Sequence, residues 1–295
     1  MALQQKQEEA FMHNFFTVNT FKGFLFSVLM LLGIAAAQNT NADFNEQDFF
    51  NNLKTSYYHL SDTPIKNFVT LVTSMKMEMF ASQQWKNAEI FPLQLIWFNP
   101  DKVYITQRGV PQLEKDKYKE YQDLIAGLKT QIRGILADLT RFYLVGLYDS
   151  IHPDYVLKHN EEAVQINFST QEAGVITRVK YLLGYNGLLI LIQVDYPLQQ
   201  KRIVIYPKFK TVKNKWLCTG WNVQSYEKGQ VVSGYDLKIK NHYINNVWVP
   251  GEIVLAVQKA DKKGQTFYDE IKFKNYLFNQ PLQLSSGTRG GAGKK

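Results

Sequence analysis

Hydrophobic and polar positions repeat with two different periods along the chain, and the period predicts where helices give way to strands. Residues 43–60 carry apolar side chains three or four positions apart, which is typical of an amphipathic helix. Residues 69–79 alternate instead, which predicts one half-buried strand. Its apolar face would consist of Val69, Leu71, Met75, Met77 and Met79.

Two further strands are predicted immediately afterwards. Residues 91–98 and 102–106 are short apolar segments, separated by the turn sequence Asn99-Pro100-Asp101. Together with the preceding strand they would form an antiparallel meander.

The helical period returns between residues 112 and 148. The apolar stripe of this segment is long, and we expect it to face the core. Gly127, Gly134 and Gly146 interrupt it and predict bends, or a division into two helices.

From residue 154 onward the pattern is that of strands and turns. Residues 175–183 and 188–195 flank Asn186-Gly187, a typical hairpin turn, and five more strands are predicted up to residue 274. The fold class is therefore α+β. We expect one large curved antiparallel sheet of about ten strands, a half-open β-barrel with helices packed on its concave face.

The N-terminal region resembles a targeting segment. Residues 24–34 are apolar, Lys22 precedes them, and the small residues Ala35 and Ala37 follow. This predicts a signal peptide over residues 1–37, secretion across the inner membrane, and a periplasmic or cell-envelope location. An uncleaved N-terminal anchor is the alternative, and Met12 could be the true start.

The remainder of the chain is predicted to be one domain with a tail. Residues 38–284 would form a single lipoprotein-carrier-like domain with the helical insertion near residues 112–148. Residues 285–295 are small, polar and basic, and we expect this tail to be disordered.

Composition narrows the class of protein. The chain has 295 residues, 45% hydrophobic and 20% charged, which is typical of a globular protein, and its aromatic share of 14% favours β-structure. The single cysteine, Cys218, excludes an intramolecular disulfide framework and a cysteine zinc cage.

No motif for catalysis or metal binding is present. The sequence has no HExxH pair and no Gly-x-Ser-x-Gly elbow, and the glycines at 290–293 do not fit a phosphate loop. The chain is therefore expected not to be an enzyme and to need no cofactor, metal or nucleic acid. An uncharacterised hydrolase remains a third hypothesis.

The charge has one informative cluster within the overall +8. Between Asp195 and Glu227 there is no acidic residue, and we expect the basic residues there to contact an anionic membrane surface or an acidic partner. Lysines that protect strand edges are the other interpretation. The candidate contact residues are Lys208, Lys210, Lys213 and Lys215.

Two short segments resemble the periplasmic lipoprotein-carrier superfamily, the outer-membrane lipoprotein-sorting proteins and their receptor and sigma-regulator relatives. Residues 93–104 (LQLIWFNPDKVY) look like the early strand–Pro–strand step of that superfamily. Residues 246–255 (NVWVPGEIVL), followed by 266–275, are similar to its closing hairpin. The order of elements agrees over residues 43–284. The long helical segment and the lack of a lipidation cysteine depart from the family pattern.

The resemblance implies a binder of hydrophobic ligands. We expect an exported carrier or chaperone that holds a lipid, or the acyl chain of a lipoprotein, in the concave face of the sheet. The residues expected to line the apolar cavity are Leu71, Met75, Met77, Met79, Leu93, Leu95 and Trp97; packing against the helices would equally explain their pattern. The alternative function is a non-catalytic structural or regulatory envelope protein that binds a protein partner through the same sheet.

Overall fold

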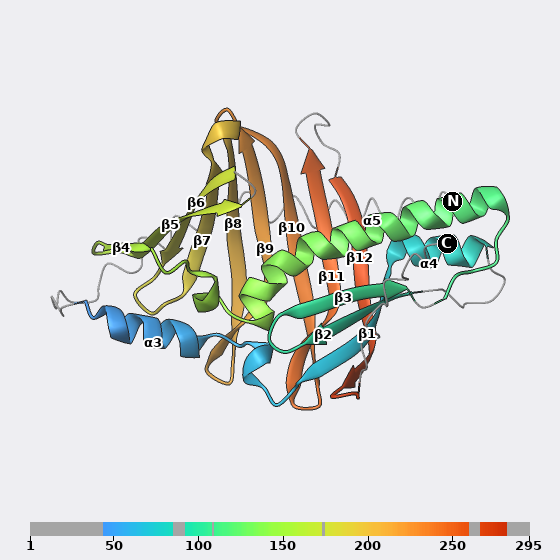
Figure 1. Cartoon of the computed structure of the whole chain (residues 1–295), viewed down its shortest axis with the longest axis horizontal. Helices are drawn as coiled ribbons and strands as arrows, with labels where there is room; N and C mark the ends of the chain where they lie inside the picture. The colour runs from blue at the N-terminus through green and yellow to red at the C-terminus, as the bar shows by residue number, and fades with distance from the viewer. Residues whose placement is uncertain (1–43, 85–91, 108, 173–174, 260–265, 282–295) are drawn as a thin grey trace, which may run out of the picture. The chain divides into compact units, whose positions relative to one another are not determined.

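The computed structural model describes residues 44–84, 92–107, 109–172, 175–259 and 266–281. The predicted signal peptide (1–37) and the predicted tail (285–295) lie outside the described residues. Twelve strands form one antiparallel sheet in the order β3-β2-β1-β12-β11-β10-β9-β8-β7-β6-β5-β4 (Figure 1). The α+β class and the single large antiparallel sheet are confirmed.

Most strand predictions agree with the structure to within a few residues. β4 was not predicted, and β8 and β10 are longer than expected. The strands are β1 (Asn67–Ser74), β2 (Leu93–Phe98), β3 (Lys102–Gln107), β4 (Val156–His159), β5 (Val164–Glu172), β6 (Val175–Leu183), β7 (Leu189–Tyr196), β8 (Lys201–Val212), β9 (Lys215–Glu227), β10 (Gln230–Ile244), β11 (Val247–Lys259) and β12 (Thr266–Phe278).

The first and last strands pair with each other inside the sheet, as the third and fourth strands from the β3 edge. β1 pairs with β2 on one side, as the meander predicts, and with the last strand, β12, on the other. Val72, for example, lies opposite both Leu93 and Phe273. The edges of the sheet are β3 and β4, which do not pair with each other, so the sheet stays open.

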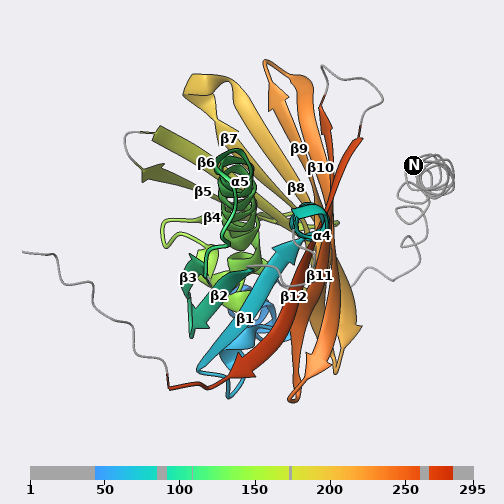
Figure 2. The same ribbon diagram turned by 90° about the vertical axis from the view of Figure 1, so that its right-hand side faces the viewer.

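Three α-helices accompany the sheet: α3 (Glu46–Ser56), α4 (Met75–Gln84) and α5 (Lys115–Leu139). A π-helical turn, η2 (Thr140–Leu144), continues α5 without a break. Figure 2, which looks along α5, shows the sheet curving around this helix, with β5 and β6 on one side and β10 to β12 on the other. Among the described residues, no helix is long and apolar enough to cross a membrane.

The expected bends at Gly127 and Gly134 are not found, because α5 runs through both glycines. Both glycines are exposed, and within the described part of the chain a Cβ at either position would have no neighbour within 4 Å. They therefore do not reflect close packing. Gly146 does mark a break. It follows η2 with φ +147°, and a Cβ there would lie 2.8 Å from the His59 ring.

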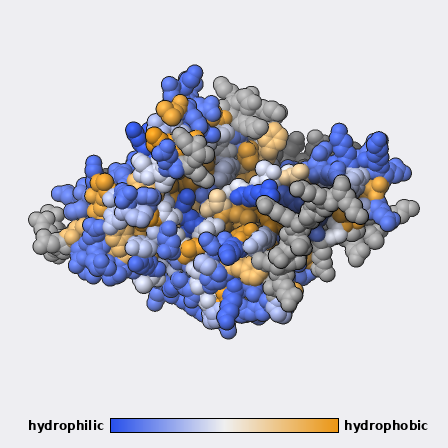
Figure 3. Space-filling view, viewed as in Figure 1, coloured by the Kyte–Doolittle hydropathy of each residue, from blue (hydrophilic) through white to orange (hydrophobic). Residues whose placement is uncertain are grey.

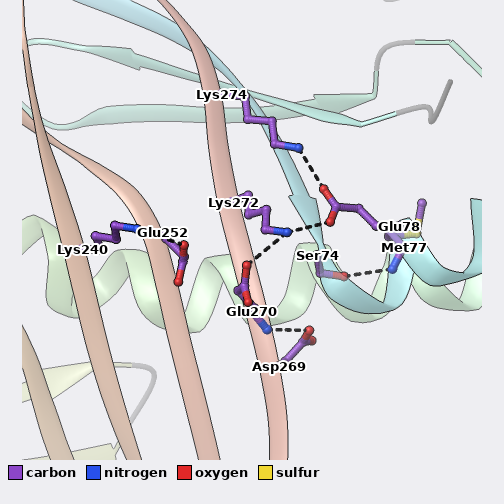
Figure 4. Close-up of polar contacts among 9 residues, drawn as sticks. All are labelled: Ser74, Met77, Glu78, Lys240, Glu252, Asp269, Glu270, Lys272 and Lys274. Atoms are coloured by element: carbon purple, nitrogen blue, oxygen red, sulfur yellow. Dashed lines mark hydrogen bonds and ion pairs between the residues drawn. The ribbon is translucent and has the colours of Figure 1, made fainter. Parts of the chain in front are cut away.

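The strand predicted over residues 69–79 is wrong in its second half. β1 ends at Ser74, and Met75 to Gln84 form α4. Ser74 Oγ accepts a hydrogen bond from the Met77 backbone N–H at 3.3 Å, which caps the helix (Figure 4). Met77, Phe80 and Ala81 are buried, and their spacing of three and one gives α4 a single apolar side.

Ion pairs with the neighbouring strand hold α4 in place. Glu78 contacts Lys272 at 2.8 Å and Lys274 at 2.9 Å, both from β12, and Lys272 also pairs with Glu270 (Figure 4). Burial raises the pKa of Glu78, but the two lysines outweigh burial and the pKa lies below its ordinary value. A lysine-rich strand 194 residues away in sequence therefore favours the helix.

Candidate functional site

The concave face of the sheet is the candidate site, and α5 occupies it. The buried residues of α5 recur at intervals of three and four: Tyr121, Ile125, Leu128, Ile132, Ile135 and Leu139. The predicted core-facing stripe is therefore confirmed. At the far end of the helix, the Phe142 ring lies 5.5 Å from Trp221 of β9, between ring centroids. The Tyr143 hydroxyl donates a hydrogen bond to the Trp248 carbonyl of β11.

A small cavity remains between α5 and the first strands. Its volume is about 10 Å³ and its lining is apolar. The lining includes Phe68, Leu95, Trp97, Leu136, Leu139, Tyr143, Phe273 and Tyr276. Pockets for small organic ligands usually measure about 300–1,000 Å³. This cavity is therefore too small to hold an acyl chain as it stands.

Three of the seven predicted lining residues share the concave face. Leu93, Leu95 and Trp97 alternate along β2 and are at most 3% exposed. Leu95 and Trp97 line the cavity, whereas Leu93 does not. Phe68, which lies opposite Trp97 in the strand register, lines it too and was missed.

Leu71 lies on the other face of the sheet. Its partner in the register is Gln94, which points away from Leu93 and Leu95. The sequence alternation predicts Leu71 on the same face as the methionines, because it treats residues 69–79 as one strand. Once β1 is aligned with β2, the inward-facing set of β1 is Phe68, Thr70 and Val72.

The three methionines do not share a face. Successive residues of a helix are rotated by about 100°, so positions two apart point in nearly opposite directions. Met77 is 1% exposed, whereas Met75 is 36% and Met79 54% exposed. None of the three lines the cavity. Ser74, a typical residue at the N-terminus of a helix, is the feature of the sequence that could have corrected this prediction.

A buried polar cluster, which the sequence did not predict, lies where α5 ends. Asp138 interrupts the apolar stripe and is 8% exposed, and Arg141 Nη1 lies 3.4 Å from its Oδ1. Burial raises the pKa of Asp138 to about 6, although Arg141 and Tyr235 of β10 both act to lower it. The cluster therefore places one titratable carboxyl in an otherwise apolar interface between helix and sheet.

The four predicted contact lysines each lie against another side chain. Lys208 pairs with Asp236, and Lys215 Nζ lies 3.6 Å from Asp62. Lys210 Nζ lies 4.8 Å from the centre of the Trp248 ring, and Lys213 donates a hydrogen bond of 2.8 Å to the Tyr243 hydroxyl. Their charges are partly satisfied within the molecule, which weakens them as a surface for an external anion.

Reactive and metal-binding groups are sparse in the described part of the chain. Cys218 is 1% exposed, and burial raises the pKa of its thiol to about 12, so the thiolate is scarce near neutral pH. Within the described ranges no group of three His, Cys, Asp or Glu side chains is placed to hold a metal ion.

Figure 3 shows that the face of the molecule seen in Figure 1 is mainly hydrophilic at its periphery, with hydrophobic residues showing near the middle.

Comparison with known proteins adds no relative: no protein-family model, curated protein or solved structure matches this chain.

Proposed function

We propose that this protein is a non-catalytic carrier or chaperone that binds an apolar chain, of a lipid or an acylated protein, on the concave face of its sheet. The observation that carries the proposal is the arrangement of one curved sheet around one amphipathic helix. In this proposal α5 occupies the binding surface when no ligand is present. The resemblance of residues 93–104 and 246–255 to the lipoprotein-carrier superfamily points to the same function.

The contacts of α5 are of a kind that an apolar ligand could replace. Apart from Asp138, the buried side chains of α5 are aliphatic or aromatic. Burial of each methylene of a ligand contributes about 0.8 kcal/mol. The free energy from burying a chain of about a dozen methylenes would thus offset much of the free energy lost when the helix leaves the sheet. The apolar cavity beside Leu139 and Trp97 is the natural point of entry, because the packing is already incomplete there.

Binding of a fluorescent fatty-acyl probe to the purified full-length protein tests the proposal. We expect saturable binding, competition by unlabelled acyl lipid, and acyl lipids in the extract of the freshly purified protein by mass spectrometry. A protein that neither binds the probe nor carries lipid is not an acyl carrier. A pull-down that yields a protein partner but no lipid would favour the structural or regulatory function instead.

Leu139→Ala and Leu124→Ala form a matched pair for locating the site. Leu139 lines the cavity, whereas Leu124 lies on the same helix outside it and is only partly buried. Enlarging the cavity should increase probe affinity in Leu139→Ala and leave it unchanged in Leu124→Ala. Equal affinities in both variants would place the probe elsewhere.

The proposal includes export to the cell envelope. N-terminal sequencing of the protein recovered from an exporting cell should begin at Gln38. Retention of residues 24–34 in a membrane fraction would support the uncleaved anchor and contradict a soluble carrier.

A further inference from the structure

The turn between β7 and β8 presents a leucine to solvent. Leu198 lies in the short 3-10 turn η4 (Pro197–Gln199) and is 80% exposed. Every other large hydrophobic side chain among the described residues is at most 55% exposed. A single exposed apolar residue is ordinary on a protein surface, so the neighbours of Leu198 decide whether it has a role.

Two more exposed apolar residues lie at the same end of the sheet. Ile176, at the start of β6, is 44% exposed, and η4 packs against β6. Val231, at the start of β10, is 52% exposed and lies opposite Tyr226 of β9. Arg202, near the start of β8, lies opposite the same Tyr226. The start of β8, which follows η4, and the start of β10 therefore lie at the same end of the sheet.

From β6 to β10, the charged residues at this end are basic in excess: four cations, Arg178, Lys201, Arg202 and Lys228, face two carboxylates, Asp195 and Glu227. Arg178 and Arg202 both lie opposite or beside Asp195, which forms an ion pair with Arg202 at 2.7 Å. Asp195 therefore cannot neutralise both arginines. Lys228, in the turn between β9 and β10, adds a further exposed cation.

A hydrogen bond joins the two turns into one surface. The backbone N–H of Lys228 donates to the carbonyl of Gln200 at 2.9 Å, which links the β9–β10 turn to the β7–β8 turn. We call this the tip surface, and it consists of Ile176, Arg178, Leu198, Arg202, Lys228 and Val231. Its apolar side chains project from turns and strand ends, with the cations beside them.

We propose that the tip surface docks on an anionic lipid bilayer. Apolar side chains with cations beside them suit the boundary between the headgroups and the acyl chains of a bilayer. There the apolar side chains are buried among the acyl chains, and the cations meet anionic headgroups. The four lysines predicted from the sequence each contact an acidic or aromatic side chain of the protein. Arg202 is likewise paired with Asp195, so the charge of the tip surface rests mainly on Arg178 and Lys228. The inference does not require that the protein binds acyl chains, although docking would bring a carrier to its lipid source.

An environment-sensitive dye on Leu198→Cys tests the docking directly. The only native cysteine, Cys218, is buried and its thiol pKa is about 12, so a maleimide dye labels the new position selectively. Leu277→Cys is the matched control, since Leu277 is 53% exposed and lies near the opposite end of the sheet, at the end of β12. With the full chain and vesicles of phosphatidylglycerol and phosphatidylcholine, we expect a blue shift of emission at position 198 only.

Matched substitutions separate the apolar and the electrostatic contributions. Leu198→Ser should lower vesicle affinity at least tenfold. Arg178→Gln with Lys228→Gln should weaken binding and reduce its dependence on salt, whereas Lys208→Gln with Lys213→Gln, which removes the same charge, should change it little. These comparisons also allow for any binding by residues 24–34, which all variants share.

Several outcomes would overturn the inference: no binding to anionic vesicles, equal binding to pure phosphatidylcholine, equal blue shifts at positions 198 and 277, or full affinity in Leu198→Ser. The protein could also bind an acidic protein instead of vesicles, and lose that binding in Leu198→Ser. That result would assign the tip surface to a protein partner and would likewise overturn the inference. The fatty-acyl probe measures the proposed carrier function separately, so either proposal can fail while the other stands.

Discussion

Arg141 lies one helical turn after Asp138, and its guanidinium is 3.4 Å from the Asp138 carboxylate at the point where α5 ends against the sheet. The Asp138 side chain is 12% exposed and that of Arg141 25%. The unfavourable free energy of removing the carboxylate from water is larger than the favourable interaction with one partly exposed guanidinium. Burial therefore dominates, and the pKa of Asp138 rises to about 6.

This pair predicts a loss of stability as pH rises. The folded state holds a proton on Asp138 up to about pH 6, whereas the unfolded chain releases it near its ordinary pKa of 3.8. Stability should therefore fall between about pH 4 and pH 6 by roughly 3 kcal/mol and stay lower above that range. Urea unfolding at several pH values measures the change. Asp138→Asn should remove this contribution, and an unchanged slope in the variant would contradict the assignment.

His59 should act in the opposite direction. Its ring is 5% exposed, and its Nε2 has no hydrogen-bond partner among the described residues. Burial lowers its pKa, although Asp62 acts to raise it. As the pH falls through 6.5, the ring is protonated in the unfolded chain before it is protonated in the folded protein. The folded state therefore loses stability on acidification below pH 6.5. His59→Phe should flatten this part of the unfolding profile. A profile unaffected by the substitution would show that the ring titrates normally.

Gly127 and Gly134 should be sites of stabilisation. Both lie inside α5, and a Cβ at either position would meet none of the atoms that the structure describes within 4 Å. Replacement of each by Ala should raise the free energy of unfolding by about 0.5–1 kcal/mol, because alanine loses less backbone entropy in a helix. Thermal unfolding monitored by circular dichroism measures the effect.

Gly220→Ala is the opposing control. Gly220 has φ +141°, and a Cβ there would lie 2.0 Å from the Leu237 carbonyl oxygen of the adjacent strand. We expect this variant to unfold at a markedly lower temperature or not to accumulate, since the backbone of β10 must shift. Equal effects of alanine at 127 and 220 would contradict the distinction.

Met77 and Met79 should respond differently to truncation. Met77→Ala empties a packed site and should cost about 2–5 kcal/mol, whereas Met79, 54% exposed, should change stability by less than about 0.5 kcal/mol. Chemical denaturation of the two variants measures the difference. Similar values would instead favour the single alternating strand.

The sequence by itself determined most of the strands and two of the three α-helices, α3 and α5. Alternation along β2, the Asn186-Gly187 turn and the stripe from Tyr121 to Leu139 are local patterns, and the structure agrees with each. These patterns reflect how side chains alternate or rotate along a regular backbone, so they can be interpreted without knowing the neighbours. The single antiparallel sheet followed because no helical segment interrupts the strands after residue 154.

Tertiary contacts decided what local patterns leave open. Residues 75–79 fit either a strand or a helix, and the capping hydroxyl of Ser74 together with ion pairs from Glu78 to β12 favours the helix. The face on which Leu71 lies depends on the register between β1 and β2, which a single strand does not specify.

The candidate site shows the same division. Leu95 and Trp97 could be predicted from their alternation. Phe68 reaches the cavity through the register of β1 with β2, and Tyr276 through the pairing of the last strand with the first. The partners of the four lysines likewise come from elements that are distant in the sequence. Proximity between such strands is set by the curvature and order of the whole sheet, and no local period records it.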